Sequence, residues 1–310
     1  MPAQPNLAQL GLTATFGDAR SLHEGLAHWN RERLALAKPR ADWESVVARD
    51  GAMLLAEGAF IEEFRQAVAS QAAEAPSAAP EFIAWFEALK DEGPGQWDPL
   101  FDWLATSASL DEMKWFLTQE AAGEAGFEDL VAMTQVKLPE RPKLELARNY
   151  WDEMGRGHAE GMHGPMLERT IRALELTPRI EETAWQSLAL ANTMTALAAN
   201  RRYVYQSIGA LGVVELTAPT RVASVAEGLK RLGAPAVARK YFALHAHLDV
   251  EHSKAWNAEA LAPLVEQDPD CARFMAEGAL MRLHCGLACF EIYRAHFWAG
   301  YEPQMQMAAE

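Results

Sequence analysis

The chain has 310 residues, of which half are hydrophobic and 23% are charged, and its net charge is -15. This length and composition are typical of a globular protein with a substantial core, arranged as one large domain or two smaller ones. The excess of acidic residues argues against nucleic acids and acidic membrane surfaces as partners, because both are bound through clustered cations.

The chain contains three cysteines, Cys271, Cys285 and Cys289. An odd and sparse count does not form a disulfide framework, so the sequence favours a reducing, cytoplasmic location. Cys285 and Cys289 are one helical turn apart beside His284, and we interpret them as small buried side chains of a core helix rather than as a soft metal site. The N-terminal residues show no signal-peptide pattern, and no apolar stretch is long enough to predict a membrane span.

Apolar residues recur at helical spacing along most of the chain. Residues 1–16 are expected to form a loose arm, and residues 72–80, small and punctuated by proline, a surface linker. A Ser-x-x-Glu capping box at Ser109 and Glu112 starts one of the stronger helices. The run 211–216 is too short and isolated to seed a sheet, so the prediction is an all-α protein. Helices are predicted over residues 18–37, 43–71, 81–89, 97–105, 109–135, 143–154, 166–176, 181–212, 218–231, 236–263 and 269–298.

The most informative stretch is the predicted helix that carries His245, Asp249 and His252. At positions i, i+4 and i+7 these side chains project within roughly 60° of one another on a helix. Two imidazoles and a carboxylate on one face are a ligand set that iron and manganese accept. The neighbouring His247 and Glu251 fall on the other side of the helix, so the pattern predicts a metal-binding face rather than a general polar surface.

Further carboxylates and imidazoles stand in apolar or glycine-rich surroundings. Glu215 lies in the apolar run 209–219, where a buried carboxylate needs a cation or a metal to face. Glu153 and His163 would be about 15 Å apart on a straight helix. Glycines between them break that helix and could bring both side chains to a metal site. Glu160 is a rival to Glu153, because it precedes His163 by one turn.

The preceding predicted helix, 109–135, carries Glu120, Glu124 and Glu128 on a common face. If this helix pairs antiparallel with the helix over 143–154, Glu124 lies nearer than Glu120 to the level of the break between residues 153 and 163. Glu124 is therefore the expected additional ligand, and Glu120 is its alternative.

The order of these residues resembles the haem-oxygenase-like diiron oxidases, which are also described as iron-containing redox enzymes. The resemblance covers about residues 105–300 and rests on Glu153-x9-His163, on Glu215 and on the His-x3-Asp-x2-His pattern that begins at His245. It implies a haem-oxygenase-like helical bundle of about seven core helices over residues 105–310, with residues 1–104 as an N-terminal helical extension. The residues that it implies as ligands of two irons are Glu153, His163, Glu215, His245, Asp249 and His252.

The resemblance also implies a function. Members that oxygenate amine nitrogen have an extra carboxylate on the preceding helix, where Glu124 or Glu120 stands here. We therefore expect a non-haem diiron oxygenase that uses two Fe²⁺ ions, O₂ and an external electron donor to N-oxygenate a small amine or amino-acid-derived substrate. The alternative at the same site is oxidative C–C cleavage or desaturation of an amino or fatty acid. An alternative of another class is a metal-free, thiaminase-like or cofactor-binding protein with Cys285 or Cys289 as nucleophile. A homodimer is compatible with these features.

Overall fold

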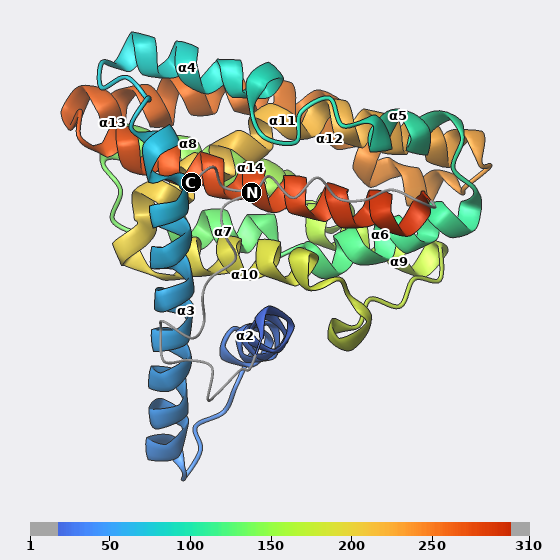
Figure 1. The fold of residues 1–310 in the computed structure, drawn as a ribbon, viewed down its shortest axis with the longest axis horizontal. Helices are drawn as coiled ribbons and strands as arrows, with labels where there is room; N and C mark the ends of the chain where they lie inside the picture. The colour runs from blue at the N-terminus through green and yellow to red at the C-terminus, as the bar shows by residue number, and fades with distance from the viewer. Residues whose placement is uncertain (1–17, 299–310) are drawn as a thin grey trace, which may run out of the picture.

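The interior of the protein is organised around the long helix α11, Val204–Arg231. In the computed structural model, which describes residues 18–298, α11 packs along α12, Ala236–Trp256, and α14, Cys271–Phe297 (Figure 1). Glycines allow a close approach of α11 and α14. A Cβ atom on Gly209 would lie 1.9 Å from the carbonyl oxygen of Met275, and one on Gly278 would lie 1.8 Å from that of Gln206. No side chain separates the two backbones at this crossing.

The other helices surround this central group. Helices α4 and α5 pack on one side of α11, and α6, α7 and α10 lie across the bundle from them (Figure 1). No β-strand occurs among residues 18–298, and the all-α prediction is confirmed. The remaining helices are α2, Ala19–Arg33; α3, Trp43–Ala72; α4, Ala79–Glu92; α5, Pro99–Thr106; α6, Leu110–Gly123; α7, Phe127–Thr134; α8, Glu140–Glu153; α9, His163–Ala173; α10, Trp185–Ala199; and α13, Ala262–Gln267.

The N-terminal helices lie against the C-terminal ones. Helix α2 packs on α10 and the C-terminal part of α3 packs on α14, whereas the N-terminal half of α3 projects from the bundle (Figure 1). The boundary predicted after residue 104 falls inside α5, which packs on α11. The division into two domains stays a prediction, and the arm predicted over residues 1–16 lies outside the described residues.

Several predicted helix boundaries are wrong. The helix predicted over 181–212 is instead α10 and the start of α11, separated by a 3₁₀ turn at Arg201–Tyr203. Helix α11 continues through Pro219, whose fixed φ suits a helix and whose missing N–H costs one backbone hydrogen bond. The helix predicted over 109–135 is instead α6 and α7, separated at Glu124 to Gly126, where Gly126 has a φ of 76°. The helix predicted over 236–263 passes through a π-helical turn, Asn257–Leu261, into α13. The capping box of Ser109 and Glu112 is confirmed.

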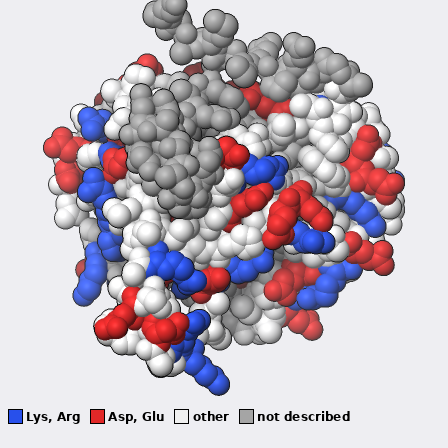
Figure 2. All heavy atoms as spheres, turned by 60° about the horizontal axis from the view of Figure 1, so that its bottom comes forward, with Lys and Arg blue, Asp and Glu red and all other residues white. Residues whose placement is uncertain are grey.

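The segment Arg201–Arg231, which includes α11, is long and apolar enough to cross a membrane by length and composition. In this fold 61% of its most apolar window is buried, and its neighbours α12 and α14 make it a core helix. On the face shown in Figure 2, acidic and basic side chains of the described residues are interspersed without a broad basic patch.

Candidate metal centre

Three residues of α12 lie on the buried face of that helix. His245, Asp249 and His252 are all buried, whereas His247 and Glu251, on the opposite side, are exposed. This division follows from the helical spacing, because positions i, i+4 and i+7 share a face and the intervening positions do not. Helix α12 thus directs two imidazoles and one carboxylate toward α11 and the junction of α8 and α9.

The junction of α8 and α9 brings Glu153 and His163 together. Glu153 is the last residue of α8 and His163 is the first residue of α9. The nine residues between them form an excursion that is closed by an antiparallel bridge between Met154 and Met162. Gly155, with a φ of 58°, packs so closely on Gly161 that a Cβ atom there would lie 2.4 Å from the Gly161 carbonyl carbon. As a result, Nδ1 of His163 lies 2.7 Å from Oε2 of Glu153.

The six buried side chains form two groups of three. Glu153, His163 and His245 make up the first group, and Glu215, Asp249 and His252 make up the second. Within each group, ligand atoms from the three residues lie within 4.8 Å of one another. The groups are neighbours, since the charge of Glu215 acts on Glu153 and that of His252 on His163. Glu160 is exposed and belongs to neither group.

The donor set fits metal ions better than it fits a network of hydrogen bonds. Nδ1 of His163 and Nδ1 of His252 are buried without a hydrogen-bond partner, although each faces a carboxylate, at 2.7 Å and 3.5 Å respectively. The Asp249 carboxylate forms no hydrogen bond or ion pair with another residue in the described part of the chain. Buried carboxylates and imidazole nitrogens that converge without satisfying one another leave room for a shared cation. Oxygen ligands combined with imidazole suit iron and manganese.

Neighbouring groups hold these side chains in position. Nδ1 of His245 donates to the carbonyl oxygen of Tyr241 at 2.7 Å, so its Nε2 is free to bind a metal. Nε2 of His252 lies 3.2 Å from a carboxylate oxygen of Asp152 and leaves Nδ1 free. The side-chain amide of Asn149 donates to Oε1 of Glu215 at 2.6 Å. Sequence reasoning missed these supporting roles, although Asn149 and Asp152 stand one turn and one residue before Glu153.

Burial dominates the electrostatics of the site. It raises the pKa of Glu153 to about 9, with a further contribution from the negative charge of Glu215. Burial, followed by Glu215 and Glu153, raises the pKa of Asp249 well above its usual value. Burial lowers the pKa of His245 to about 4. For His252, burial acts in the lowering direction, but the nearby carboxylates of Glu215, Asp152 and Glu153 outweigh it and raise the pKa to about 9. Without a cation, burial and mutual repulsion therefore favour the protonated forms of Glu153 and Asp249.

The three acids of the predicted 109–135 helix do not share a face, because that helix is broken. Glu120 lies in α6, and its carboxylate accepts a hydrogen bond from the Tyr293 hydroxyl at 2.9 Å. Glu124 is the C-cap of α6, and its Oε1 accepts the backbone N–H groups of Gly126 and Phe127.

Glu128, in the first turn of α7, lies beside the first turn of α9, which begins at His163. Its Oε1 would be 2.2 Å from a Cβ atom on Gly164, the residue after His163. Its charge acts on both Glu153 and His163. Sequence reasoning named Glu128 but did not choose it, because the break at Gly126 was not foreseen. The break therefore makes Glu128 a candidate for the additional carboxylate beside Glu124, whose charge interacts with that of Glu153 as well.

Comparison with known families agrees with this site. Residues 114–287, more than half of the chain, match the family described as iron-containing redox enzymes. The chain belongs to the iron-containing redox enzyme family. All six residues of the two ligand groups fall inside the matched segment, as does Glu128. The family name indicates iron as the metal, in agreement with the oxygen and imidazole donors.

The fold of this iron-containing redox enzyme is also similar to a solved structure, a CADD-like protein of unknown function from Nostoc punctiforme. The two share 14% sequence identity, and the match has a TM-score of 0.47 and covers 76% of this chain and 97% of the other. No curated protein sequence matches this chain.

Proposed function

We propose that this protein is a non-haem diiron oxygenase. Glu153, His163 and His245 hold one iron, and Glu215, Asp249 and His252 hold the other. The observation that carries the proposal is the convergence of two adjacent buried groups of three ligand-type residues, in which two imidazole nitrogens have no hydrogen-bond partner. Membership of the iron-containing redox enzyme family supports iron as the metal in both positions.

The bound pair of Fe²⁺ ions supplies electrons for the reduction of O₂. The chain's own residues fix the ligands and limit the access of water. The Tyr241 carbonyl orients the His245 ring, and Asn149 donates a hydrogen bond to one oxygen of Glu215. Both side chains are therefore already oriented for metal binding and would need no change of rotamer. Trp256, which is fully buried one turn beyond His252, donates its indole N–H to the carbonyl oxygen of Ile208 and fixes this part of α12 against α11.

We further propose N-oxygenation of a small amine as the reaction. An additional carboxylate beside the ligand groups supports this choice, and we assign that place to Glu128, with Glu124 as the second candidate. Hydroxylation of an amine consumes one O₂, two electrons and two protons, and gives an N-hydroxylamine and water. Oxidation of the two Fe²⁺ ions would supply these two electrons once, so an external electron donor would be needed to return the pair to Fe²⁺ for the next turnover.

Oxidative C–C cleavage or desaturation by the same ligands is the second reaction to consider, and product analysis distinguishes it from N-oxygenation. A metal-free mechanism with a cysteine nucleophile has less support. Cys285 and Cys289 are buried, and burial raises the pKa of Cys285 to about 11 and that of Cys289 further. Both thiols stay protonated near neutral pH, and a thiol is a poor nucleophile compared with a thiolate.

The first experiment is anaerobic loading with Fe²⁺, removal of free metal and measurement of bound iron. We expect close to two irons per chain for the natural protein and a loss of at least one in His245→Ala and Asp249→Ala. The matched controls are His247→Ala and Glu251→Ala, on the exposed side of the same helix. An iron content far below two in the natural protein, or equal losses in the control variants, would show that these residues do not form a diiron site.

The second experiment exposes the iron-loaded protein to ¹⁸O₂ with a reductant and a set of small primary amines. Mass spectrometry should detect one ¹⁸O atom on nitrogen in the product. Products shortened by one carbon, or dehydrogenated without gain of oxygen, would instead assign cleavage or desaturation to the site.

A further inference from the structure

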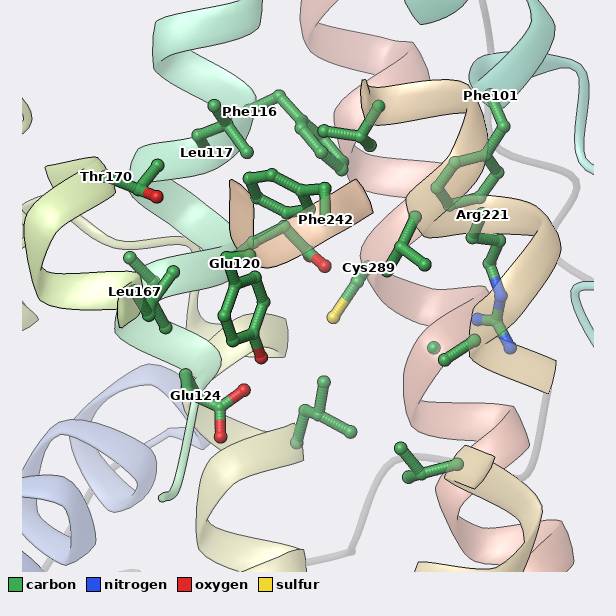
Figure 3. A pocket seen from close by; sticks show the side chains of 18 of the residues that line it. Phe101, Phe116, Leu117, Glu120, Glu124, Leu167, Thr170, Arg221, Phe242 and Cys289 are labelled. Carbon is green, nitrogen blue, oxygen red and sulfur yellow. The ribbon is translucent and has the colours of Figure 1, made fainter. Parts of the chain in front are cut away.

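A cavity of about 160 Å³ lies beside the candidate metal centre, between α5, α6, α9, α11, α12 and α14 (Figure 3). Two of its wall residues connect it with the metal ligands. Val214 precedes Glu215, and the ring of Tyr241 lies 4.2 Å, centroid to centroid, from the ring of His245. An apolar cavity of about 150 Å³ in another protein encloses a benzene molecule, so this space suits a small organic ligand.

Most of the cavity wall is apolar, and the exceptions are few. Phe101, Phe116 and Phe242 contribute aromatic surface, and leucine and valine side chains fill much of the remainder. Four charged side chains line the cavity: Glu120, Glu124, Arg221 and Arg282. Figure 3 shows the Arg221 guanidinium and the Glu124 carboxylate on opposite sides of the space.

The two arginines form an unusual pair. Nε of Arg221 donates to the carbonyl oxygen of Thr217 at 3.1 Å, and Nη2 donates to the hydroxyl of the same residue. Arg282 forms no hydrogen bond or ion pair with any residue between 18 and 298, and its Nη1 is buried without a partner. The Nη1 atoms of Arg282 and Arg221 lie 3.0 Å and 3.8 Å from the point where a Cβ atom on Gly286 would stand.

The positive charges of Arg221 and Arg282 are not neutralised by neighbouring carboxylates. Neither arginine forms an ion pair with a carboxylate in the described part of the chain. Glu120 is the acid whose charge acts on both, but it is already bound by the Tyr293 hydroxyl, and burial raises its pKa. Burial, followed by the positive charge of Arg282, lowers the pKa of Arg221 to about 9, so this group is still a cation at neutral pH. An unpaired buried charge is costly, and a bound anion would offset it.

We propose that Arg221 and Arg282 bind the carboxylate of the substrate. Planar guanidinium groups match a carboxylate through paired hydrogen bonds. The apolar middle of the ligand then fills the aromatic part of the cavity, and its other end points past Tyr241 toward the metals, where the acid Glu124 stands. The substrate class is therefore an amino acid whose amine and carboxylate are separated by a short apolar chain. That the bound carboxylate belongs to the substrate rests on the proposed oxygenase function. The carboxylate-binding site itself rests on the two arginines.

The test uses the metal-free protein and isothermal titration calorimetry with hexanoate, its neutral analogue hexanamide, and 6-aminohexanoate. We expect both carboxylates to bind at least tenfold more tightly than hexanamide. Arg221→Gln and Arg282→Gln should each weaken hexanoate binding by about 10- to 100-fold, as for loss of a charge-assisted hydrogen bond, and should leave hexanamide unchanged. Arg201→Gln is the matched control, because Arg201 also donates to a backbone carbonyl, that of Thr134, but lies outside the cavity.

Equal affinities of hexanoate and hexanamide for the natural protein would overturn the proposal without any variant. So would hexanoate binding that survives both cavity substitutions or is lost equally in Arg201→Gln. If Arg221→Gln does not fold, Arg282→Gln and the comparison of hexanoate with hexanamide still test the carboxylate site. Because no metal is present, the result is separate from that of iron loading. Carboxylate binding without iron binding contradicts only the oxygenase, and iron binding without carboxylate selectivity contradicts only the arginine site.

Discussion

The crossing of α11 and α14 at Gly209 makes a prediction that can be calculated from the structure. An added Cβ atom in Gly209→Ala would stand 1.9 Å from the carbonyl oxygen of Met275 and 2.6 Å from its carbonyl carbon. Cβ atoms essentially never approach another heavy atom to less than 3.0 Å, and both of these neighbours are backbone atoms that cannot rotate away. The two helices must therefore separate by about 1 Å, which is overpacking of a dense core.

Overpacking of this kind costs about 1–3 kcal/mol, and we place Gly209→Ala near the upper end because the clash is with backbone. For a protein of this size each kcal/mol lowers the melting temperature by about 2–4 °C, so we expect a decrease of roughly 4–10 °C. Gly58→Ala is the matched control, since Gly58 is inside α3 and an added Cβ atom there has no neighbour within 4 Å. That change should stabilise the protein by about 0.5–1 kcal/mol through helix propensity.

Thermal unfolding followed by circular dichroism at the helical band measures both variants. A melting temperature of Gly209→Ala that equals or exceeds that of Gly58→Ala would refute the reasoning. The same variant should bind less iron, because Glu215 lies on α11 and ligands must be held within about 0.5 Å of their working positions. A change in melting temperature without any change in iron content would show that the position of Glu215 does not depend on the helix crossing at Gly209.

Three further predictions concern the metal centre. Affinity for Mn²⁺, measured by calorimetry, should rise at least tenfold per pH unit from pH 6 to 9, because Glu153 and His252, with their pKa values raised to about 9, hold protons that the metal must displace. A flat profile would contradict this charge assignment. Asn149→Ala removes the hydrogen bond to Glu215 and should weaken metal binding by about 10- to 100-fold with little change in melting temperature. Glu128→Gln should lower metal affinity at least tenfold, as expected for loss of a ligand or of a residue that supports one. Glu120→Gln should leave metal affinity unchanged. The reverse result would indicate that the additional carboxylate is Glu120, on α6.

The α12 part of the site could be predicted because it depends on one regular helix. The positions of His245, Asp249 and His252 follow from 3.6 residues per turn, and the apolar residues around them indicate which face is buried. Distant parts of the fold are not needed for that inference. The ordering of further carboxylates and imidazoles along the chain, together with the resemblance, then indicated the other candidates.

The other parts of the candidate site depend on backbone conformations that the spacing of apolar residues in the sequence does not predict. Glycines between Glu153 and His163 predicted a break, but the bridge and the Gly155–Gly161 contact that bring the two side chains together are tertiary features. Gly126 takes a left-handed conformation that divides a seemingly continuous helix, so Glu124 stands at a helix C-terminus and not inside a helix. Pro219 was expected to separate the helices over 181–212 and 218–231, whereas the surrounding packing maintains one helix through it.

The closed excursion between α8 and α9 has a consequence for engineering the protein. Its tip, residues 156–160, is exposed, whereas the bridge between Met154 and Met162 ties its base. The entropy needed to close a loop grows only with the logarithm of its length, so a reporter peptide inserted at the tip adds little to that cost. Since backbone contacts already hold the base, such an insertion should leave Glu153 and His163 in place. The tip is therefore a position for attaching a label close to these two residues.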